Sequence, residues 1–237
     1  MITFTTAPGA LPPGQRIYAI GDIHGCADRL RALHGIIARD LAARPVAAAT
    51  LVHVGDYVDR GPDSAGVVEI LANPSLPMAS VVNLMGNHEQ MMLLALTHAD
   101  KRFAAHWLEN GGAAALASWG IEPSRRLSEW ADGVPAAHLA FLRGLKKTHR
   151  AGDFLFVHAG IRPGLPIAFQ DPEDLLWMRE PFLSWEGDLG AIVVHGHTPT
   201  KEPVVRPNRI GIDTGAVLGG PLTCAVLEAD RLGFLHA

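Results

Sequence analysis

The stretch GDIHGCADRL, residues 21–30, follows the apolar run IYAI and places an acid and an imidazole two positions apart between glycines. A turn at the end of a strand requires only the glycines, so the two polar side chains need another explanation. Side chains two positions apart in an extended segment face the same side, and Asp22 and His24 can therefore hold one ion. We interpret this stretch as a strand end that carries metal ligands.

Four further apolar runs end in the same way, at VHVGDYVDRGPDS, VNLMGNHEQ, LFVHAGI and IVVHGHTPT. Short β-branched runs bounded by glycine or polar residues are typical of buried strands. In α/β sheets, ligands bind beyond the carboxyl ends of the strands, where glycine lets the backbone approach closely. We therefore expect the five polar clusters to meet at one place, after strands at residues 17–20, 51–54, 81–85, 154–157 and 192–194.

Helical patterns lie between the first predicted strands. Residues 27–42 place leucine and isoleucine on one face of a helix, and Pro62 is well placed to open a second helix in PDSAGVVEILA. The order strand, polar cluster, helix, strand is the βαβ rhythm of an α/β fold. Two further predicted strands, at residues 210–212 and 222–227, imply a mixed sheet that doubles into two layers.

Residues 89–150 contain further helical patterns separated by glycine-containing loops, and we expect them to form a helical insert. The chain of 237 residues fits one substantial domain, and its 48% hydrophobic content can build a full core without disulfides. We therefore predict a single domain over residues 1–237 that carries this insert.

Composition and charge exclude several classes of partner. The formal net charge of −4 and the pI near 6.3 provide no basic surface for nucleic acid or for an anionic membrane. The N-terminal segment has neither the basic start nor the apolar core of a signal peptide, and no apolar run is long enough to span a bilayer. Cys26 and Cys224 lack CxxC spacing, which favours reduced thiols. These features predict a cytoplasmic protein without a nucleic-acid or membrane partner.

The residue types in the five clusters suit a pair of divalent metal ions. Carboxylates, imidazoles and an amide carbonyl are ligands that manganese, iron and zinc accept. Asp22 and His24 would hold one ion, and Asp56 would bridge it to a second ion, which three more strand ends would complete with Asn87, His158 and His197. Two ions about 3.5–4 Å apart can hold a hydroxide and stabilise both ends of an in-line displacement at phosphorus. We expect Mn²⁺ in both positions, with Fe or Zn as alternatives.

Four other polar residues are candidates for catalysis. The planar guanidinium groups of Arg60 and Arg179 match phosphate oxygens in a bidentate manner. His88 can protonate the leaving alkoxide, and Asp59 can hold its other ring nitrogen in the right tautomer. Because adjacent side chains of an extended segment face opposite ways, we expect His88 to point away from the ion that Asn87 binds.

The motifs GDIHG, GDYVDRG, GNHE, HAG and GHTP, in this order over residues 21–199, resemble the phosphoprotein phosphatase branch of the calcineurin-like metallophosphoesterases. Its compact bacterial and phage members are the nearest in pattern. The resemblance implies a four-layer α/β/β/α sandwich with two mixed β-sheets and a dinuclear metal site. It also implies hydrolysis of phosphomonoesters through direct attack by a metal-bound hydroxide, without a phosphoenzyme.

Motif position carries the family's functional residues over to this chain. The resemblance places the first metal on Asp22, His24 and Asp56, and the second metal on Asp56, Asn87, His158 and His197. His88 and Asp59 match the acid dyad of the family, and Arg60 matches its phosphate-binding arginine. Arg179 matches the second arginine through its WxR context alone.

The sequence departs from the wider family at GHTP. Many metallophosphoesterases carry GHxH with the second histidine as a ligand, but that position here is Pro199, which resembles the protein-phosphatase branch and leaves the first metal with fewer protein ligands. The motif register selects His197 of HGH as the ligand, so we expect His195 to pack or to support the ligands. The C-terminal region lacks the SAPNYC stretch of eukaryotic enzymes, which puts their toxin sensitivity and partner subunits in doubt.

Two remote alternatives fit parts of the sequence. Residues 213–215 spell DTG, the aspartic-protease tripeptide, but a protease of this size needs a second such aspartate or a symmetric dimer, and the βαβ rhythm does not fit an all-β protease. A non-catalytic metal-binding scaffold would keep the metal ligands and lose the acid and phosphate-binding residues. His88, Asp59 and Arg60 are all present, which disfavours that alternative.

The sequence as a whole predicts a metal-dependent phosphoesterase. The first choice is a bacterial-type protein phosphatase acting on phosphoserine or phosphothreonine, with phosphotyrosine as a further substrate, so that its partner is a phosphorylated protein or a small phosphoester. The alternative within the same branch is symmetrical hydrolysis of dinucleoside tetraphosphates. The DRG of GDYVDRG and the GNHE motif resemble the protein phosphatases more than the tetraphosphatases, which favours the first choice.

Overall fold

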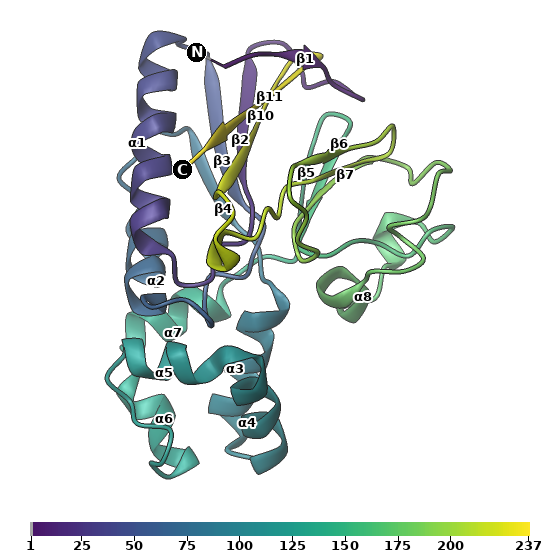
Figure 1. Cartoon of the computed structure of the whole chain (residues 1–237). Helices are drawn as coiled ribbons and strands as arrows, with labels where there is room; N and C mark the ends of the chain where they lie inside the picture. Colours follow the sequence, from purple (N-terminus) through teal and green to yellow (C-terminus); the bar gives the residue numbers. More distant parts are fainter. Residues whose placement is uncertain (1) are drawn as a thin grey trace.

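Two mixed β-sheets pack face to face in the computed structural model, which describes residues 2–237 (Figure 1). The first sheet has six strands in the order β1 (Thr5–Thr6), β11 (Arg231–His236), β10 (Thr223–Glu228), β2 (Gln15–Ile20), β3 (Ala48–His53) and β4 (Ser80–Asn83). The second has five strands in the order β5 (Thr148–Ala151), β6 (Phe154–Val157), β7 (Ile192–His195), β9 (Arg209–Gly211) and β8 (Val204–Val205).

Parallel strands form the centre of both sheets. β2, β3 and β4 run parallel to one another, and so do β6, β7 and β9. The remaining strands join in antiparallel pairs, which makes both sheets mixed, as expected from the sequence. Because the carboxyl ends of parallel strands meet at one edge of a sheet, the loops after these central strands are brought together.

Helices cover the outer faces of the two sheets. α1 (Ala27–Ala43) and α2 (Ser64–Ala72) lie on the first sheet, and the short helix α8 (Pro172–Trp177) lies on the second with the 3-10 helix Ile167–Phe169 before it (Figure 1). The four-layer α/β/β/α arrangement predicted from the resemblance is therefore confirmed, although the fourth layer is thin. No helix described for residues 2–237 combines the length and the apolar character needed to cross a membrane.

Apolar side chains fill the space between the sheets. Each strand alternates its side chains between two faces, so the inward residues of both sheets meet in one layer. The buried cluster in this layer draws on both sheets and includes Ile17, Val52, Phe154, Phe156, Val194, Ile210 and Leu227. This layer holds the two sets of strand ends in register with each other.

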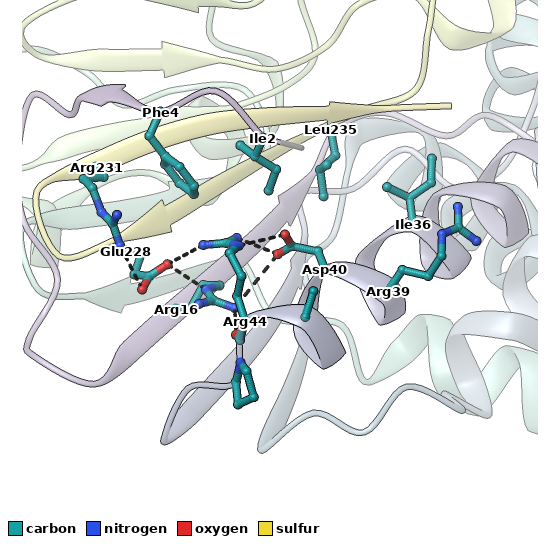
Figure 2. A pocket seen from close by; sticks show the side chains of 12 residues that line it. Ile2, Phe4, Arg16, Ile36, Arg39, Asp40, Arg44, Glu228, Arg231 and Leu235 are labelled. Atoms are coloured by element: carbon teal, nitrogen blue, oxygen red, sulfur yellow. Dashed lines mark hydrogen bonds and ion pairs between the residues drawn. The ribbon is translucent and has the colours of Figure 1, made fainter.

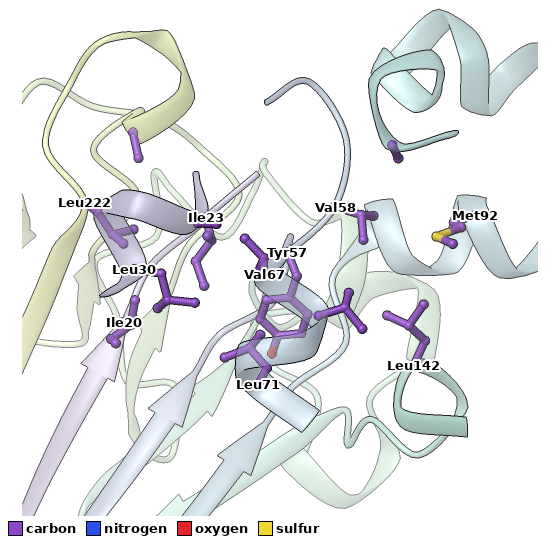
Figure 3. Close-up of a cluster of buried hydrophobic side chains, with 14 of the residues drawn as sticks. Ile20, Ile23, Leu30, Tyr57, Val58, Val67, Leu71, Met92, Leu142 and Leu222 are labelled. Atoms are coloured by element: carbon purple, nitrogen blue, oxygen red, sulfur yellow. The ribbon is translucent and has the colours of Figure 1, made fainter. Parts of the chain in front are cut away.

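A helical segment lies between β4 and β5, at the end of the first sheet where its parallel strands terminate (Figure 1). It consists of α3 (Asn87–His98), α4 (Lys101–Trp107), a π-helical turn at Leu108–Gly112, α5 (Ala113–Ser118), α6 (Leu127–Gly133) and α7 (Ala136–Arg143). Met92 and Leu142 of this insert belong to the same buried cluster as Leu30 of α1 and Val67 of α2 (Figure 3). The insert therefore shares one hydrophobic core with the sandwich.

Several boundaries differ from the sequence expectations. All seven predicted strands are present, but β1, β5, β8 and β11 were not predicted, since two of them have only two residues and β5 (THRA) contains no apolar run. β5 occupies the end of the range assigned to the insert, whose helices run from Asn87 to Arg143. Pro62 does not open α2, because the helix begins at Ser64 after Asp63, whose carboxylate accepts the Gly66 N–H at 2.8 Å.

A polar network closes the opposite end of the first sheet, around a cavity of about 800 Å³ (Figure 2). The buried Arg16 at the start of β2 donates to Glu228 at 2.9 Å, and Arg44 after α1 binds Glu228 at 2.9 Å and Asp40 at 2.6 Å. Arg231 lies 3.1 Å from Glu228. The network ties the beginning of β2 to the end of α1, the two elements that flank GDIHG.

Replacing Phe156 by alanine is expected to lower the free energy of unfolding by about 3–5 kcal/mol, because its ring is fully buried between the two sheets. The matched control is Phe169→Ala, since the Phe169 ring is 73% exposed and its loss should change the free energy by no more than about 0.5 kcal/mol. Equilibrium unfolding in urea measures both values. Equal losses in the two variants would contradict this description of the core.

Candidate active site

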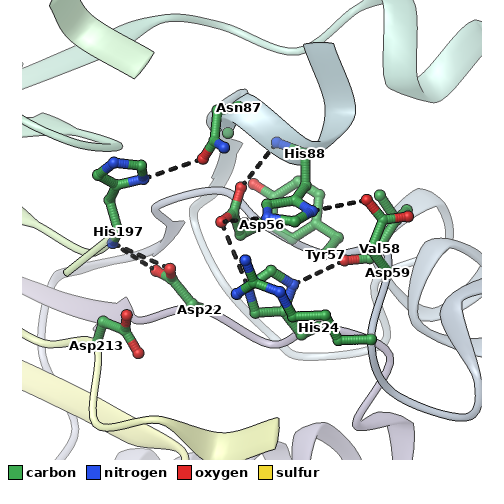
Figure 4. Close-up of polar contacts among 12 residues, drawn as sticks. Asp22, His24, Asp56, Tyr57, Val58, Asp59, Asn87, His88, His197 and Asp213 are labelled. Atoms are coloured by element: carbon green, nitrogen blue, oxygen red, sulfur yellow. Dashed lines mark hydrogen bonds and ion pairs between the residues drawn. The ribbon is translucent and has the colours of Figure 1, made fainter. Parts of the chain in front are cut away.

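The five polar clusters meet at the carboxyl ends of the central strands, and Figure 4 shows residues of four of them: GDIHG, GDYVDRG, GNHE and GHTP. Direct contacts connect all five of them: Asp22 with His197, His24 with Asp56, Asp56 with His158, and Asn87 with both His158 and His197. The convergence expected from the sequence is therefore present in the fold.

Two groups of side chains are close enough to hold a metal ion each. His24, Asp56 and His88 form the first group, and Asp56, His158 and His197 form the second, with the ligand atoms of each group within 4.8 Å of one another. All of these residues are buried. Asp56 belongs to both groups, which is the position expected of a carboxylate that bridges two ions.

Backbone carbonyls hold two histidines of the site, His24 and His158, in the tautomer that leaves Nε2 free to bind a metal. His24 donates its Nδ1–H to the Val58 carbonyl at 2.8 Å, and His158 donates its Nδ1–H to the Val54 carbonyl at 3.0 Å. Burial lowers the pKa of His24 well below its ordinary value and lowers the pKa of His158 to about 3, so both rings are neutral near pH 7. Their Nε2 atoms thus carry lone pairs directed into the site.

Acceptor atoms crowd together in the second group. The unprotonated Nε2 of His158 lies 2.9 Å from Asn87 Oδ1 and 3.3 Å from Asp56 Oδ1, and His197 Nδ1 lies 3.0 Å from the same Asn87 oxygen. The lone pair of His158 Nε2 and those of the Asn87 and Asp56 oxygens repel one another at such distances unless a cation lies between them. The donor set therefore fits a divalent metal ion.

Asp22 is not in the group that contains His24 and Asp56, because the third member of that group is His88. The two Asp22 oxygens accept the backbone N–H of His197 at 3.0 and 3.2 Å, and Asp22 belongs to neither of the two close groups. Burial raises the pKa of Asp22 well above its ordinary value, and Asp213 and Asp56 raise it further. Asp213, the aspartate of the protease-like tripeptide, thus lies beside Asp22 in this α/β site.

His88, a member of the first group, forms a buried pair with Asp59, which belongs to neither group. His88 Nδ1 lies 2.7 Å from Asp59 Oδ2, and both side chains are almost fully buried. Burial lowers the pKa of His88, whereas the charge of Asp56 opposes this effect. The pairing expected for an acid dyad is present, and the second ring nitrogen of His88 lies 3.9 Å from Asp56.

The two predicted phosphate-binding arginines lie at the exposed rim of the site. Arg60 is exposed and its Nη1 donates to His24 Nε2 at 3.0 Å. Arg179 is also exposed. Burial, the nearby His158 and then the charge of Arg179 lower the pKa of His197 to about 2, so Arg179 lies close to that ring. Both guanidinium groups are therefore near the ligand groups and accessible to an anion.

The backbone of the site differs from the extended conformation assumed from the sequence. Five non-glycine residues adopt the left-handed region: His24 (φ 43°), Asp56 (φ 53°), Asp59 (φ 73°), Arg60 (φ 65°) and His197 (φ 65°). Asn87 and His88 are also not extended, because they form the first turn of α3. Their side chains therefore diverge through the rotation of a helix and not through strand alternation.

Glu89 is a structural residue of the site that sequence reasoning did not single out. Its buried carboxylate accepts the backbone N–H groups of Asp56 (2.9 Å), Tyr57 (2.7 Å), Val58 (3.2 Å) and Gly86 (2.9 Å). The available signal was the capping-box spacing, a glutamate three residues after the residue that precedes the helix.

Two glycines allow the loops to approach one another. A Cβ atom on Gly86 would overlap the Asp56 carboxylate, and one on Gly55 would lie 2.7 Å from the Gly86 nitrogen and 2.8 Å from His158 Nδ1. Gly55 also has a φ of 110°, which other residues rarely adopt. The glycines in these motifs therefore make room for the ligands.

His195 lies outside both ligand groups. Its ring packs edge-on against Phe182 with the centroids 5.0 Å apart, its Nδ1–H donates to the Gly196 carbonyl at 3.0 Å, and its buried Nε2 has no partner among the described residues. The structure thus separates the two histidines of HGH, with His197 among the ligand atoms and His195 in the packing behind them.

Two groups of candidate oxygen and nitrogen ligands, at the common edge of two packed sheets, form the arrangement expected of a metal-dependent phosphoesterase. Comparison of sequences then identifies the family, because residues 15–230 match the calcineurin-like phosphoesterases and the chain belongs to that family. Members of this family use a dinuclear metal site. Hydrolysis of phosphoesters is therefore the reaction class of this protein.

Individual relatives differ in their stated substrates. Serine/threonine-protein phosphatase 1 of Salmonella typhimurium is 32% identical over 225 residues, which cover 90% of this chain and 93% of the relative. The asymmetrical bis(5′-nucleosyl)-tetraphosphatase PrpE of Bacillus velezensis is 30% identical, with 86% of each chain covered. A solved structure of a candidate diadenosine tetraphosphatase is 25% identical, has a TM-score of 0.67, and covers 96% of this chain and 98% of its own.

The separation of the two HGH histidines leads to a prediction about metal content. His197→Ala should lose metal from the second group, since this ring lies among the ligand atoms, whereas His195→Ala should keep the full metal content and much of its rate. Elemental analysis of both purified variants measures the metal. The opposite pattern would show that His195, and not His197, is the metal ligand of HGH.

Proposed function

We propose that this protein is a metal-dependent phosphatase that removes phosphate from phosphoserine and phosphothreonine in proteins, with phosphotyrosine as a further substrate. The observation that carries the proposal is the 2.7 Å contact between Asp59 and His88, whose other ring nitrogen lies 3.9 Å from Asp56. A proton donor is needed when the leaving group is a basic alkoxide, as in phosphoserine. The likeness to a serine/threonine-protein phosphatase along most of the chain supports the same choice.

Two divalent metal ions are the proposed cofactors. Mn²⁺ is the first choice, and Fe and Zn are the alternatives. The first ion would be held by Asp22, His24 and Asp56, and the second by Asp56, Asn87, His158 and His197. When bound, the ions supply Lewis acidity and positive charge at the phosphoryl group. The neutral, correctly oriented imidazoles described above support this assignment.

The protein side chains would complete the reaction. His88 would keep the proton on Nδ1 in a hydrogen bond to Asp59 and would transfer the proton on Nε2 to the oxygen of the leaving alcohol, which leaves a neutral imidazole. Arg60 and Arg179, exposed at the rim, would bind the non-bridging phosphate oxygens and orient the ester. The core that the insert shares with the sandwich supports the proposal that residues 1–237 act as a single domain.

Hydrolysis of dinucleoside tetraphosphates is the second candidate. The relatives whose names state this activity cover most of this chain, and the same metal ligands would serve both substrates. The two reactions differ in the leaving group, which is a nucleoside phosphate in place of an alkoxide. A phosphate leaving group needs less proton assistance, so the buried His88–Asp59 pair favours the protein substrate.

Removal of metal tests the proposed cofactors. Chelator-treated, metal-free enzyme should lose its phosphatase activity and regain it with Mn²⁺. Asp56→Asn should lower kcat/KM more than any other ligand substitution, by more than about 10²-fold, because its carboxylate belongs to both groups. Full activity in protein that elemental analysis shows to be metal-free would contradict the proposal.

A direct comparison of substrates tests the proposed specificity. With Mn²⁺ present, kcat/KM for phosphoserine and phosphothreonine peptides should exceed that for diadenosine tetraphosphate by at least about tenfold, or about 1.4 kcal/mol in the transition state. Release of inorganic phosphate and chromatography of nucleotides measure the two reactions. A higher kcat/KM for the tetraphosphate would contradict the first proposal and favour dinucleoside-tetraphosphate hydrolysis. The products would then distinguish symmetrical cleavage (ADP alone) from asymmetrical cleavage (ATP and AMP).

A further inference from the structure

Trp107, the last residue of α4, reaches from the helical insert to the acid dyad. Its indole Nε1–H donates to both oxygens of Asp59, at 2.8 and 2.9 Å. Asp59 in turn lies 2.7 Å from His88 Nδ1. Both Trp107 and Asp59 are fully buried. A continuous chain of hydrogen bonds therefore runs from the insert through the carboxylate to the imidazole.

The insert holds the same loop at a second point. The backbone N–H of Arg60 donates to the Gly111 carbonyl at 3.2 Å, and Gly111 has a φ of 103°. A Cβ atom on Gly111 would lie 2.8 Å from Arg60 Cγ, so the turn fits closely against the loop. The insert therefore contacts two consecutive residues of DRG, one through a side chain and one through its backbone.

The position of the Trp107 ring is determined by its packing. The ring meets Trp130 at a centroid distance of 5.9 Å, and a Cβ atom on Gly112 would lie 2.6 Å from it. The Asp59 backbone is held independently, because its N–H donates to Ser64 Oγ at 3.0 Å. The indole N–H thus acts on the Asp59 carboxylate alone, and the loop keeps another anchor without it.

We propose that Trp107 is a positioning residue for proton transfer by His88, because its N–H fixes the plane of the Asp59 carboxylate so that Oδ2 faces His88 Nδ1. The inference rests on the proposed role of His88 as the proton donor. The Asp59 carboxylate has two side-chain partners among the described residues, the Trp107 N–H and the His88 ring, and loss of the first leaves only the second to restrain rotation about its Cβ–Cγ bond. The helical insert would then be part of the catalytic apparatus and not only a cover.

The test uses two substrates that differ in their need for a proton. In the Mn²⁺-loaded enzyme, Trp107→Phe should lower kcat/KM about tenfold on a phosphoserine peptide and no more than about twofold on p-nitrophenyl phosphate, whose phenolate leaves with little help. The ratio of the two values does not depend on the fraction of protein that is folded. It therefore separates a loss of proton transfer from a loss of stability.

Trp130→Phe is the matched control. It makes the same chemical change in the same buried cluster, but the Trp130 N–H has no partner among the described residues. Because phenylalanine keeps an aromatic ring at position 130 for Trp107 to pack against, the control should change kcat/KM for both substrates by the same factor. If Trp107→Phe also changes both substrates equally, Trp107 serves only packing and the proposal is overturned.

His88→Asn separates this inference from the proposed function. His88→Asn alone should show a strong dependence on the leaving group, with a loss of about 10²–10⁴-fold on the peptide, and adding Trp107→Phe should then cause little further change in the ratio. No leaving-group dependence in His88→Asn would refute the acid role itself. If adding Trp107→Phe to His88→Asn lowers the ratio of the two kcat/KM values as much as Trp107→Phe does alone, only the role of Trp107 is refuted.

A shape-conserving replacement covers the case in which Trp107→Phe does not fold. Benzothienylalanine at position 107 keeps the size of the indole and replaces its N–H with sulfur. The same selective loss on the phosphoserine peptide is expected, with an unchanged melting temperature. A variant that is as active as the wild type on both substrates would overturn the proposal.

Discussion

The buried carboxylate of Glu89 is the interaction on which the geometry of the site depends. Four backbone N–H groups donate to it, three from the loop after β3 and one from Gly86, which precedes α3. The loop that carries Asp56 and the helix that begins with Asn87 are thereby held against each other. Loss of this carboxylate would leave four buried donors without partners, at a cost of about 1–3 kcal/mol each.

This arrangement stores conformational strain at five residues of the candidate site. His24, Asp56, Asp59, Arg60 and His197 all adopt left-handed backbone conformations. Such conformations cost of order 1–3 kcal/mol each and persist only where the surrounding structure determines them. The backbone thus turns sharply after each strand and directs side chains from different strands toward common points.

The insert provides the second support of the site. Its helices bury Met92, Trp107 and Leu142 in the same cluster as the residues of α1 and α2, so its position relative to the sheets is determined by core packing. Because of this packing, the insert can present a hydrogen-bond donor to Asp59 and a carbonyl to Arg60. The other end of the first sheet is closed by paired charges around Arg16, far from these contacts.

The sequence by itself determined the positions of the central strands and the polar residues at their ends, because an apolar run followed by glycine and acid is a local pattern. It therefore predicted the α/β class, the five converging clusters and the likeness of the motifs to a phosphatase branch. It did not predict the helical start at Asn87 or the edge strand β5, whose four residues have no apolar run.

Only the tertiary structure decided how the side chains meet. The hydrogen bond between Trp107 and Asp59 joins residues 48 positions apart, and the one between Asp22 and His197 joins residues 175 apart. No local pattern encodes such contacts, because they depend on how the insert and the two sheets pack around shared cores. The left-handed turns follow from the same cause, since they are stable only when distant segments hold the loops in place.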